Sequence, residues 1–140
     1  MNRRSDSNAS FSARWRVRSY ELDSNAHVNN AVYLAYAEEI ATLHAESLGF
    51  GREWTQARDA AWVVRRHEIL YHRPAVYGDE VELTTTLVSM RGARGVRQTT
   101  ITRTDGTPLA DITTEWVWVR AADGRPTRIP PELFAAFEPG

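Results

Sequence analysis

The chain has 140 residues and a formal net charge of −1, the size of one ordinary domain with no electrostatic footprint for nucleic acid. It has no cysteine, which excludes disulfides, thiolate metal sites and cysteine nucleophiles. Lysine is absent too, so Schiff-base chemistry and a Walker-type phosphate loop are excluded.

No apolar run approaches the roughly 18 residues that a membrane-spanning helix needs. The basic, Ser-rich start of the chain is not followed by the apolar stretch of a secretory signal, so we expect a cytoplasmic protein without membrane association. Residues 1–13 are predicted to form a disordered tail. Residues 14–140 predict a single domain, because no repeat or internal linker divides them.

The first predicted element is a strand at residues 14–20, where apolar side chains alternate with arginines. A polar loop rich in turn-forming residues follows. Residues 31–48 predict the one long helix, which should be mostly buried because apolar side chains line two adjoining faces. Asn29 or Asn30 can cap its start, and Gly49 is placed to end it.

The rest of the chain is rich in β-forming residues and turn signals. A single helix cannot cover both faces of the resulting sheet. The sequence therefore predicts an α+β fold in which a curved antiparallel sheet of about five strands wraps around one long helix. An open sheet edge also favours pairing with a second copy. The later strands are predicted at 61–72, 80–90, 96–104 and 108–120, followed by a short helix in the segment PPELFAAF.

The loop before the helix carries a carboxylate, a carboxamide and an imidazole at alternate positions, Asp23, Asn25 and His27. An extended stretch would point all three the same way, towards free N–H groups at the helix start. Thioester cleavage needs a carboxylate as general base or nucleophile. It also needs N–H donors for the oxyanion, each worth about 2.7–4 kcal/mol. Spacing alone leaves an alternative, in which these are turn residues and His27 is a surface histidine.

Two segments carry a family resemblance. The stretch YELDSNAHVNNAVYLAYAEE resembles the signature of the 4-hydroxybenzoyl-CoA thioesterase-like branch of the hotdog superfamily. Its HVNN form is most similar to acyl-ACP thioesterases and their single-domain bacterial relatives. The segment VVRRHEILYHRPAVYGDEVEL resembles the strand, Pro and Gly-Asp turn of the same family. Covering about residues 14–120, the resemblance implies a hotdog fold and hydrolysis of an acyl-CoA or acyl-ACP thioester.

The resemblance also implies roles for single residues. Asp23 matches the acid that serves as nucleophile or general base, and Asn25 and His27 match the polar residues that accompany it. Asn30 falls where the family places a helix-start N–H against the thioester carbonyl. Plant acyl-ACP enzymes carry two hotdog repeats and this chain has room for one. A homodimer or homotetramer is therefore implied, with the active site at the subunit interface.

Further residues can contact the substrate. Tyr33 can shape the acyl pocket. The arginines around a predicted hairpin form either a solvated turn or a contact with CoA phosphates or an acidic carrier protein. We expect no cofactor and no metal, because His67 and His72 show no known ligand spacing. The hairpin arginines are Arg91, Arg94 and Arg97.

A non-catalytic acyl-CoA or acyl-ACP binding or regulatory domain on the same fold is the alternative function, since fold does not fix function. The complete set of Asp23, Asn25 and His27 favours an enzyme, because a binding module needs no base. Another hotdog branch uses an acid on the helix, but its loop motif is missing here. We therefore interpret Glu38 and Glu39 as solvated or interface carboxylates. A hotdog dehydratase is disfavoured because its His-containing loop motifs are not matched.

Overall fold

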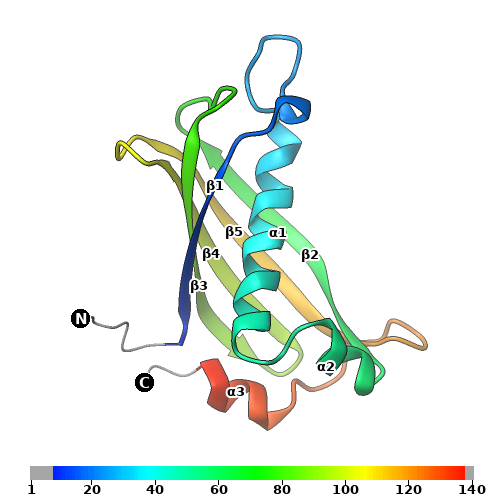
Figure 1. The fold of residues 1–140 in the computed structure, drawn as a ribbon. Coiled ribbons are helices and arrows are strands. Elements are labelled where there is room, and N and C mark those ends of the chain that lie inside the picture. The colour runs from blue at the N-terminus through cyan, green and yellow to red at the C-terminus, as the bar shows by residue number, and fades with distance from the viewer. Residues whose placement is uncertain (1–7, 138–140) are drawn as a thin grey trace.

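The computed structural model describes residues 8–137, which form one antiparallel sheet curled around a long helix (Figure 1). This arrangement confirms the predicted α+β architecture. The strands are β1 (Ser10–Arg16), β2 (Ala60–Tyr71), β3 (Glu80–Arg91), β4 (Arg94–Arg103) and β5 (Pro108–Arg120). The helices are the 3-10 helix η1 (Ser19–Glu21), α1 (Asn30–Ser47), α2 (Arg52–Ala57) and α3 (Pro131–Phe137). The strand order β1-β3-β4-β5-β2 leaves β1 and β2 at the two edges.

Strand β1 departs most from the prediction. It starts at Ser10 rather than residue 14, so the predicted tail is wrong for residues 10–13, while residues 1–7 lie outside the described part of the chain. The reason is tertiary: the Ser10 and Ser12 hydroxyls bond to threonine hydroxyls of β3 at 2.8 and 2.7 Å. The predicted strand end is also wrong, because residues 19–21 turn into η1.

Helix α1 begins and ends one residue earlier than predicted. Asn29 is its N-cap, and the side-chain oxygen of Asn29 accepts the backbone N–H of Ala31 at 2.9 Å. Gly49, with φ of 88°, follows the helix end in the left-handed region that glycine tolerates. The short α2 was not predicted. Within residues 8–137, no helix is long and apolar enough to cross a membrane.

The core lies between α1 and the concave face of the sheet. At its centre Ile40 of α1 meets Leu83, Ile101 and Ile112 from three strands, each at most 2% exposed. Burying such a side chain contributes about 1.5–3 kcal/mol. A second apolar cluster, where Trp118 packs beside α2 and α3, covers the sheet near the C-terminal end of α1 (Figure 1). The N-terminal end of α1 instead meets loops, and the candidate site lies there.

Candidate active site

The loop between η1 and α1 folds as a turn around the carboxylate of Asp23. Its Oδ1 accepts the backbone N–H of Asn25 at 2.8 Å and that of His27 at 3.1 Å. The Asp23 N–H donates to the His27 carbonyl at 2.7 Å, and Ala26 takes a positive φ of 62°. Oδ2 of Asp23 makes no hydrogen bond within the described residues. One carboxylate oxygen therefore fixes the side chain and leaves the other available.

This turn corrects one expectation. The loop is not extended, so the prediction that Asp23, Asn25 and His27 all point the same way is wrong. The physical reason is that the Asp23 carboxylate binds the backbone of its own loop and reverses the chain. Asp23 and His27 still line one cavity, whereas Asn25 is exposed and outside its lining.

A cavity of about 170 Å³ lies between this loop, the first turn of α1 and the end of β2. It brings together three of the four predicted catalytic residues and the predicted substrate contact Tyr33. The opposite wall comes from residues 71–74, which sequence reasoning did not assign to the site although they belong to the second motif. The lining residues are Asp23, His27, Val28, Asn30, Tyr33, Tyr71, His72, Arg73 and Pro74.

Hydrogen bonds tie the two motifs together. The Val28 N–H donates to the Ala75 carbonyl at 2.9 Å, and the Ala75 N–H donates to the Tyr33 hydroxyl at 3.0 Å. The Tyr71 hydroxyl donates to the Asn30 carbonyl at 2.8 Å, and the Tyr33 and Tyr71 rings meet edge to face. Burial raises the pKa of Tyr33, so its hydroxyl stays neutral. The cavity wall is thus built from segments far apart in the sequence.

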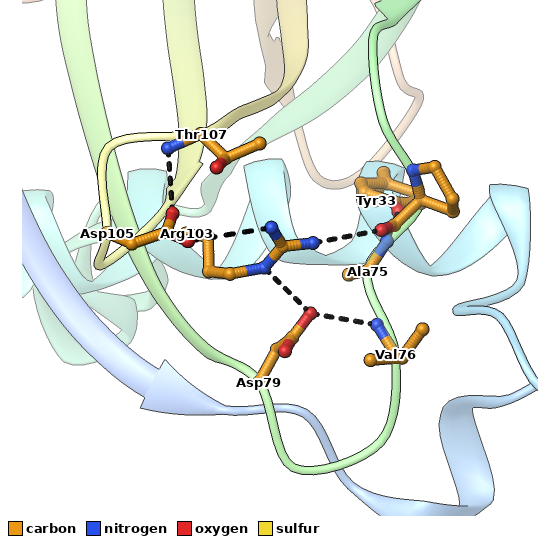
Figure 2. A network of polar contacts seen from close by, with 8 residues as sticks. Tyr33, Ala75, Val76, Asp79, Arg103, Asp105 and Thr107 are labelled. Atoms are coloured by element: carbon orange, nitrogen blue, oxygen red, sulfur yellow. Dashed lines mark hydrogen bonds and ion pairs between the residues drawn. The ribbon is translucent and has the colours of Figure 1, made fainter.

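The Gly-Asp turn of the second motif holds this wall in place (Figure 2). Arg103 reaches across from β4: its Nε donates to Oδ2 of Asp79 at 3.1 Å, and its Nη2 donates to the Pro74 carbonyl at 3.4 Å. The same Asp79 oxygen accepts the Val76 N–H at 3.0 Å. Gly78 turns the chain with φ of 84°. The motif therefore contributes architecture rather than a reacting group.

The start of α1 borders the cavity and has one backbone N–H group without a partner among the described residues. Asn30 is the first helical residue and lines the cavity, and its backbone N–H has no partner among the described residues. The first N–H groups of a helix have no intrahelical acceptor, and they carry the positive end of the helix dipole. This N–H is a donor for a negatively charged oxygen beside Asp23.

A buried carboxylate anchors the loop to the helix. Glu21 is 8% exposed, and its Oε1 accepts the Tyr36 hydroxyl at 2.6 Å and the Arg18 N–H at 2.8 Å. Its carbonyl accepts the N–H of Asn29 at 2.8 Å. Burial and the Glu21 carboxylate raise the pKa of Tyr36. Sequence reasoning missed Glu21, because a glutamate beside a turn gives no signal of burial.

The structure does not place the other predicted substrate contacts in this site. Arg94 pairs with Val117 near the end of β5, whereas Tyr71 of the cavity pairs with Ala110 near its start. Arg94 Nε donates instead to Glu115 Oε2 at 2.7 Å. Arg91 lies beside Arg94 in the same hairpin, so neither reaches the cavity of its own subunit. Their contact with CoA stays a prediction that needs a neighbouring subunit.

Comparison with known proteins identifies the family of the chain. The family model described as acyl-ACP thioesterase N-terminal domain matches residues 8–137. The chain belongs to the acyl-ACP thioesterase family. This thioesterase is 35% identical to the long-chain acyl-CoA thioesterase FadM of Escherichia coli K12 over 105 residues, which cover 74% of this chain and 79% of FadM. It is 31% identical to the acyl-CoA thioester hydrolase YbgC of Escherichia coli O6:H1 over 127 residues, which cover 89% of this chain and 95% of YbgC.

A solved structure identifies the fold of this thioesterase. The 1,4-dihydroxy-2-naphthoyl-CoA thioesterase from Synechocystis superposes with a TM-score of 0.84 at 18% identity, covering 91% of this chain and 95% of that one. The predicted hotdog fold is therefore confirmed. The family match and the two bacterial relatives confirm the predicted enzyme class, a thioester hydrolase.

Proposed function

We propose that Asp23 is the carboxylate with which this thioesterase cleaves its substrate, as general base on water or as nucleophile on the carbonyl. The observation that carries the proposal is that Asp23 and Asn30, the first residue of α1, line one cavity. Two backbone N–H groups hold Oδ1 of Asp23, so the side chain is preorganised.

We propose complementary roles for the groups around Asp23. A thioester carbonyl that accepts the Asn30 N–H would have its oxyanion stabilised by about 2.7–4 kcal/mol. His27, in the cavity wall, and Asn25, at the exposed tip of the loop, are proposed to orient water. Tyr33, a buried residue that lines the cavity, is proposed to contact the acyl group.

We propose a homodimer formed through β2, which is a 12-residue edge strand. Its outward side chains Val63 and Leu70 are 44% and 61% exposed. A long unpaired edge strand is a template for another strand. Two identical strands related by a two-fold axis pair antiparallel, so the two ends of β2 meet. Because Tyr71 and His72 at the end of β2 line the cavity, the second subunit would complete the site. Pairing of such dimers would give the homotetramer.

Acyl-CoA is the proposed substrate. FadM and YbgC, whose names give acyl-CoA thioesters as substrates, are matched over most of their own length. Arg73 lies at the cavity, where a guanidinium suits the phosphates of CoA. A cytoplasmic location fits such a substrate and a chain without cysteine, and is part of the proposal.

The test is thiol release from a panel of acyl-CoA and acyl-ACP substrates by wild type, Asp23→Asn and Asp23→Ala. We expect folded variants whose kcat falls about 10²–10⁴-fold, the usual contribution of acid–base catalysis. Asp123→Asn, which changes a turn far from the cavity, is the matched control and should keep full activity. Wild-type turnover by both Asp23 variants would refute the role of Asp23. Tight acyl-CoA binding without thiol release would favour the binding-domain alternative.

A further inference from the structure

A second cavity lies at the opposite end of α1, between the helix and the sheet. Its volume is about 60 Å³, and its walls are largely apolar, with Ala41 and Ala45 of the helix facing Trp62 and Trp116 of the sheet. One water needs roughly 10–15 Å³ by this measure, so the cavity holds about four or five small groups. It can take the end of a chain but not a whole ligand.

A buried cation stands in the wall of this apolar cavity. Arg97 is 7% exposed, and its Nη1 donates to Nδ1 of His44 at 2.9 Å and to Oγ1 of Thr85 at 3.3 Å. The guanidinium also lies 5.5 Å from the Phe137 ring. No carboxylate within residues 8–137 comes within ion-pair distance of Arg97. Buried charges are normally paired, and this one has no anionic partner among the described residues.

The neighbours of Arg97 do not supply the missing negative charge. Burial lowers the pKa of Arg97 to about 10, which leaves it charged at neutral pH. Burial and the Arg97 charge lower the pKa of His44 to about 4, so His44 is neutral and its Nδ1 accepts from Arg97. Trp116 lines the same cavity, and its Nε1 is buried without a partner among the described residues. The cavity therefore holds a charged donor and an unpaired N–H donor, while the described residues supply only neutral acceptors.

We propose that this cavity binds the carboxylate at the far end of a dicarboxylic acyl group, and that Arg97 selects thioesters of dicarboxylic acids. The inference rests on the proposed thioesterase function and its β2-paired dimer. A guanidinium fork matches a carboxylate with two parallel hydrogen bonds, and the apolar walls accommodate the methylenes that lead to it.

The dimer supplies the path between this cavity and the reacting carbonyl. Within one subunit, Ala41 lies eleven residues beyond Asn30, roughly 16 Å along the helix, and the core fills the space between. Antiparallel pairing of two β2 strands instead sets the Trp62 end of one beside the Tyr71 end of the other. Trp62 lines the Arg97 cavity and Tyr71 lines the Asp23 cavity. The acyl chain would therefore run from one subunit's Asp23 to the other subunit's Arg97.

Kinetics on matched chains tests the selectivity. Suberyl-CoA and octanoyl-CoA have equal length and differ in the terminal carboxylate, and we expect kcat/KM to favour suberyl-CoA by at least about tenfold. Arg97→Met should bring the ratio near one, mainly through a loss on suberyl-CoA, and Arg97→Lys should keep part of the preference. Arg14→Met, an exposed arginine on β1, is the matched control. Equal turnover of the two substrates by wild type, or an equal loss on both in Arg97→Met, would overturn the inference.

A binding measurement separates this inference from the proposed function. Free suberate should raise the melting temperature of wild type and of Asp23→Asn, but not of Arg97→Met, and octane-1,8-diol should have no effect. Stabilisation that needs Arg97 in a protein without thioesterase activity would keep the carboxylate site and reject the function. Asp23-dependent hydrolysis with no suberate effect on wild type would reject the carboxylate site alone. If Arg97→Met does not fold, the comparison is between wild type and Arg97→Lys. An equal rise in melting temperature with suberate in both proteins would contradict the role of the guanidinium fork.

Discussion

At the scale of single residues, polar side chains do two different jobs in this thioesterase. Oδ1 of Asp23 accepts two backbone N–H groups of its own loop, and Oδ2 makes no hydrogen bond within the described residues. His44 is 1% exposed and sits between the Asn8 carbonyl and Arg97, with the first contact at 2.7 Å. Its ring is held in the neutral form with a hydrogen on Nε2. A buried neutral histidine makes folding stability depend on pH.

The pKa of His44, lowered to about 4, predicts acid sensitivity. Its unfolded value is near 6.5, so between pH 4 and 6.5 the unfolded chain binds more protons, and stability falls as pH falls through that window. From pH 7 to pH 5 we expect His44 to account for a loss of about 2 kcal/mol. Urea unfolding of wild type and His44→Gln at both pH values measures it. Parallel losses in the two proteins would contradict the assignment.

At the scale of elements, the N-cap of α1 holds the start of this helix beside the candidate site. Asn29 caps the helix through Ala31, and Asn29 is itself held by the Glu21 carbonyl. The cap stops the first turn from fraying, which keeps the Asn30 N–H directed at the cavity. A residue that touches no reacting atom therefore sets the geometry of the proposed oxyanion donor.

Removing this cap should affect both stability and rate. Asn29→Ala is expected to lower the free energy of unfolding by about 1 kcal/mol and to reduce kcat more than it raises KM. Asn29→Ser keeps a capping oxygen and should restore most of both. Denaturant unfolding and steady-state kinetics on one acyl-CoA provide the measurement. An unchanged kcat in a destabilised Asn29→Ala would mean that helix fraying does not reach the site.

At the scale of the whole molecule, the β2 edge of the sheet has no partner strand within the described chain. The described chain buries one face of the sheet against α1, yet β2 remains an edge beside the Asp23 cavity. Leu70 projects from this edge with 61% of its surface exposed. Pairing through β2 would cover that surface and bring the second subunit to the cavity.

A charged side chain at the β2 edge should therefore disrupt the proposed dimer. Leu70→Glu is expected to convert a dimer of 15.9 kDa chains to monomers at micromolar concentration and to lower activity with it. Val88→Glu makes the same apolar-to-acid change at an exposed valine of β3, away from the β2 edge, and should leave the proposed dimer intact. Analytical ultracentrifugation of the three proteins gives the masses. A Leu70→Glu dimer with full activity would place the interface elsewhere.

Local patterns were enough for most of the architecture, and the family resemblance of two motifs implied the reaction class. Alternation and turn residues predicted β2 to β5 within a few residues, and the Asn-rich start and Gly49 delimited α1. The two motifs indicated a hotdog thioesterase and the carboxylate at Asp23. The predictions of the elements succeed because strand alternation and helix capping depend on neighbours along the chain, whereas the role of Asp23 stays a prediction.

Long-range contacts decided the rest. Residues 10–13 join the sheet because β3 offers them partners, and residues 71–74 reach Asp23 only because the sheet folds them onto α1. Arg97 looked like its neighbours in a hairpin cluster, yet it alone of the three is buried. The burial of a side chain depends on which segments from elsewhere in the chain pack against it. Burial in turn decides whether a charged side chain needs a partner, and local sequence patterns do not reveal either property.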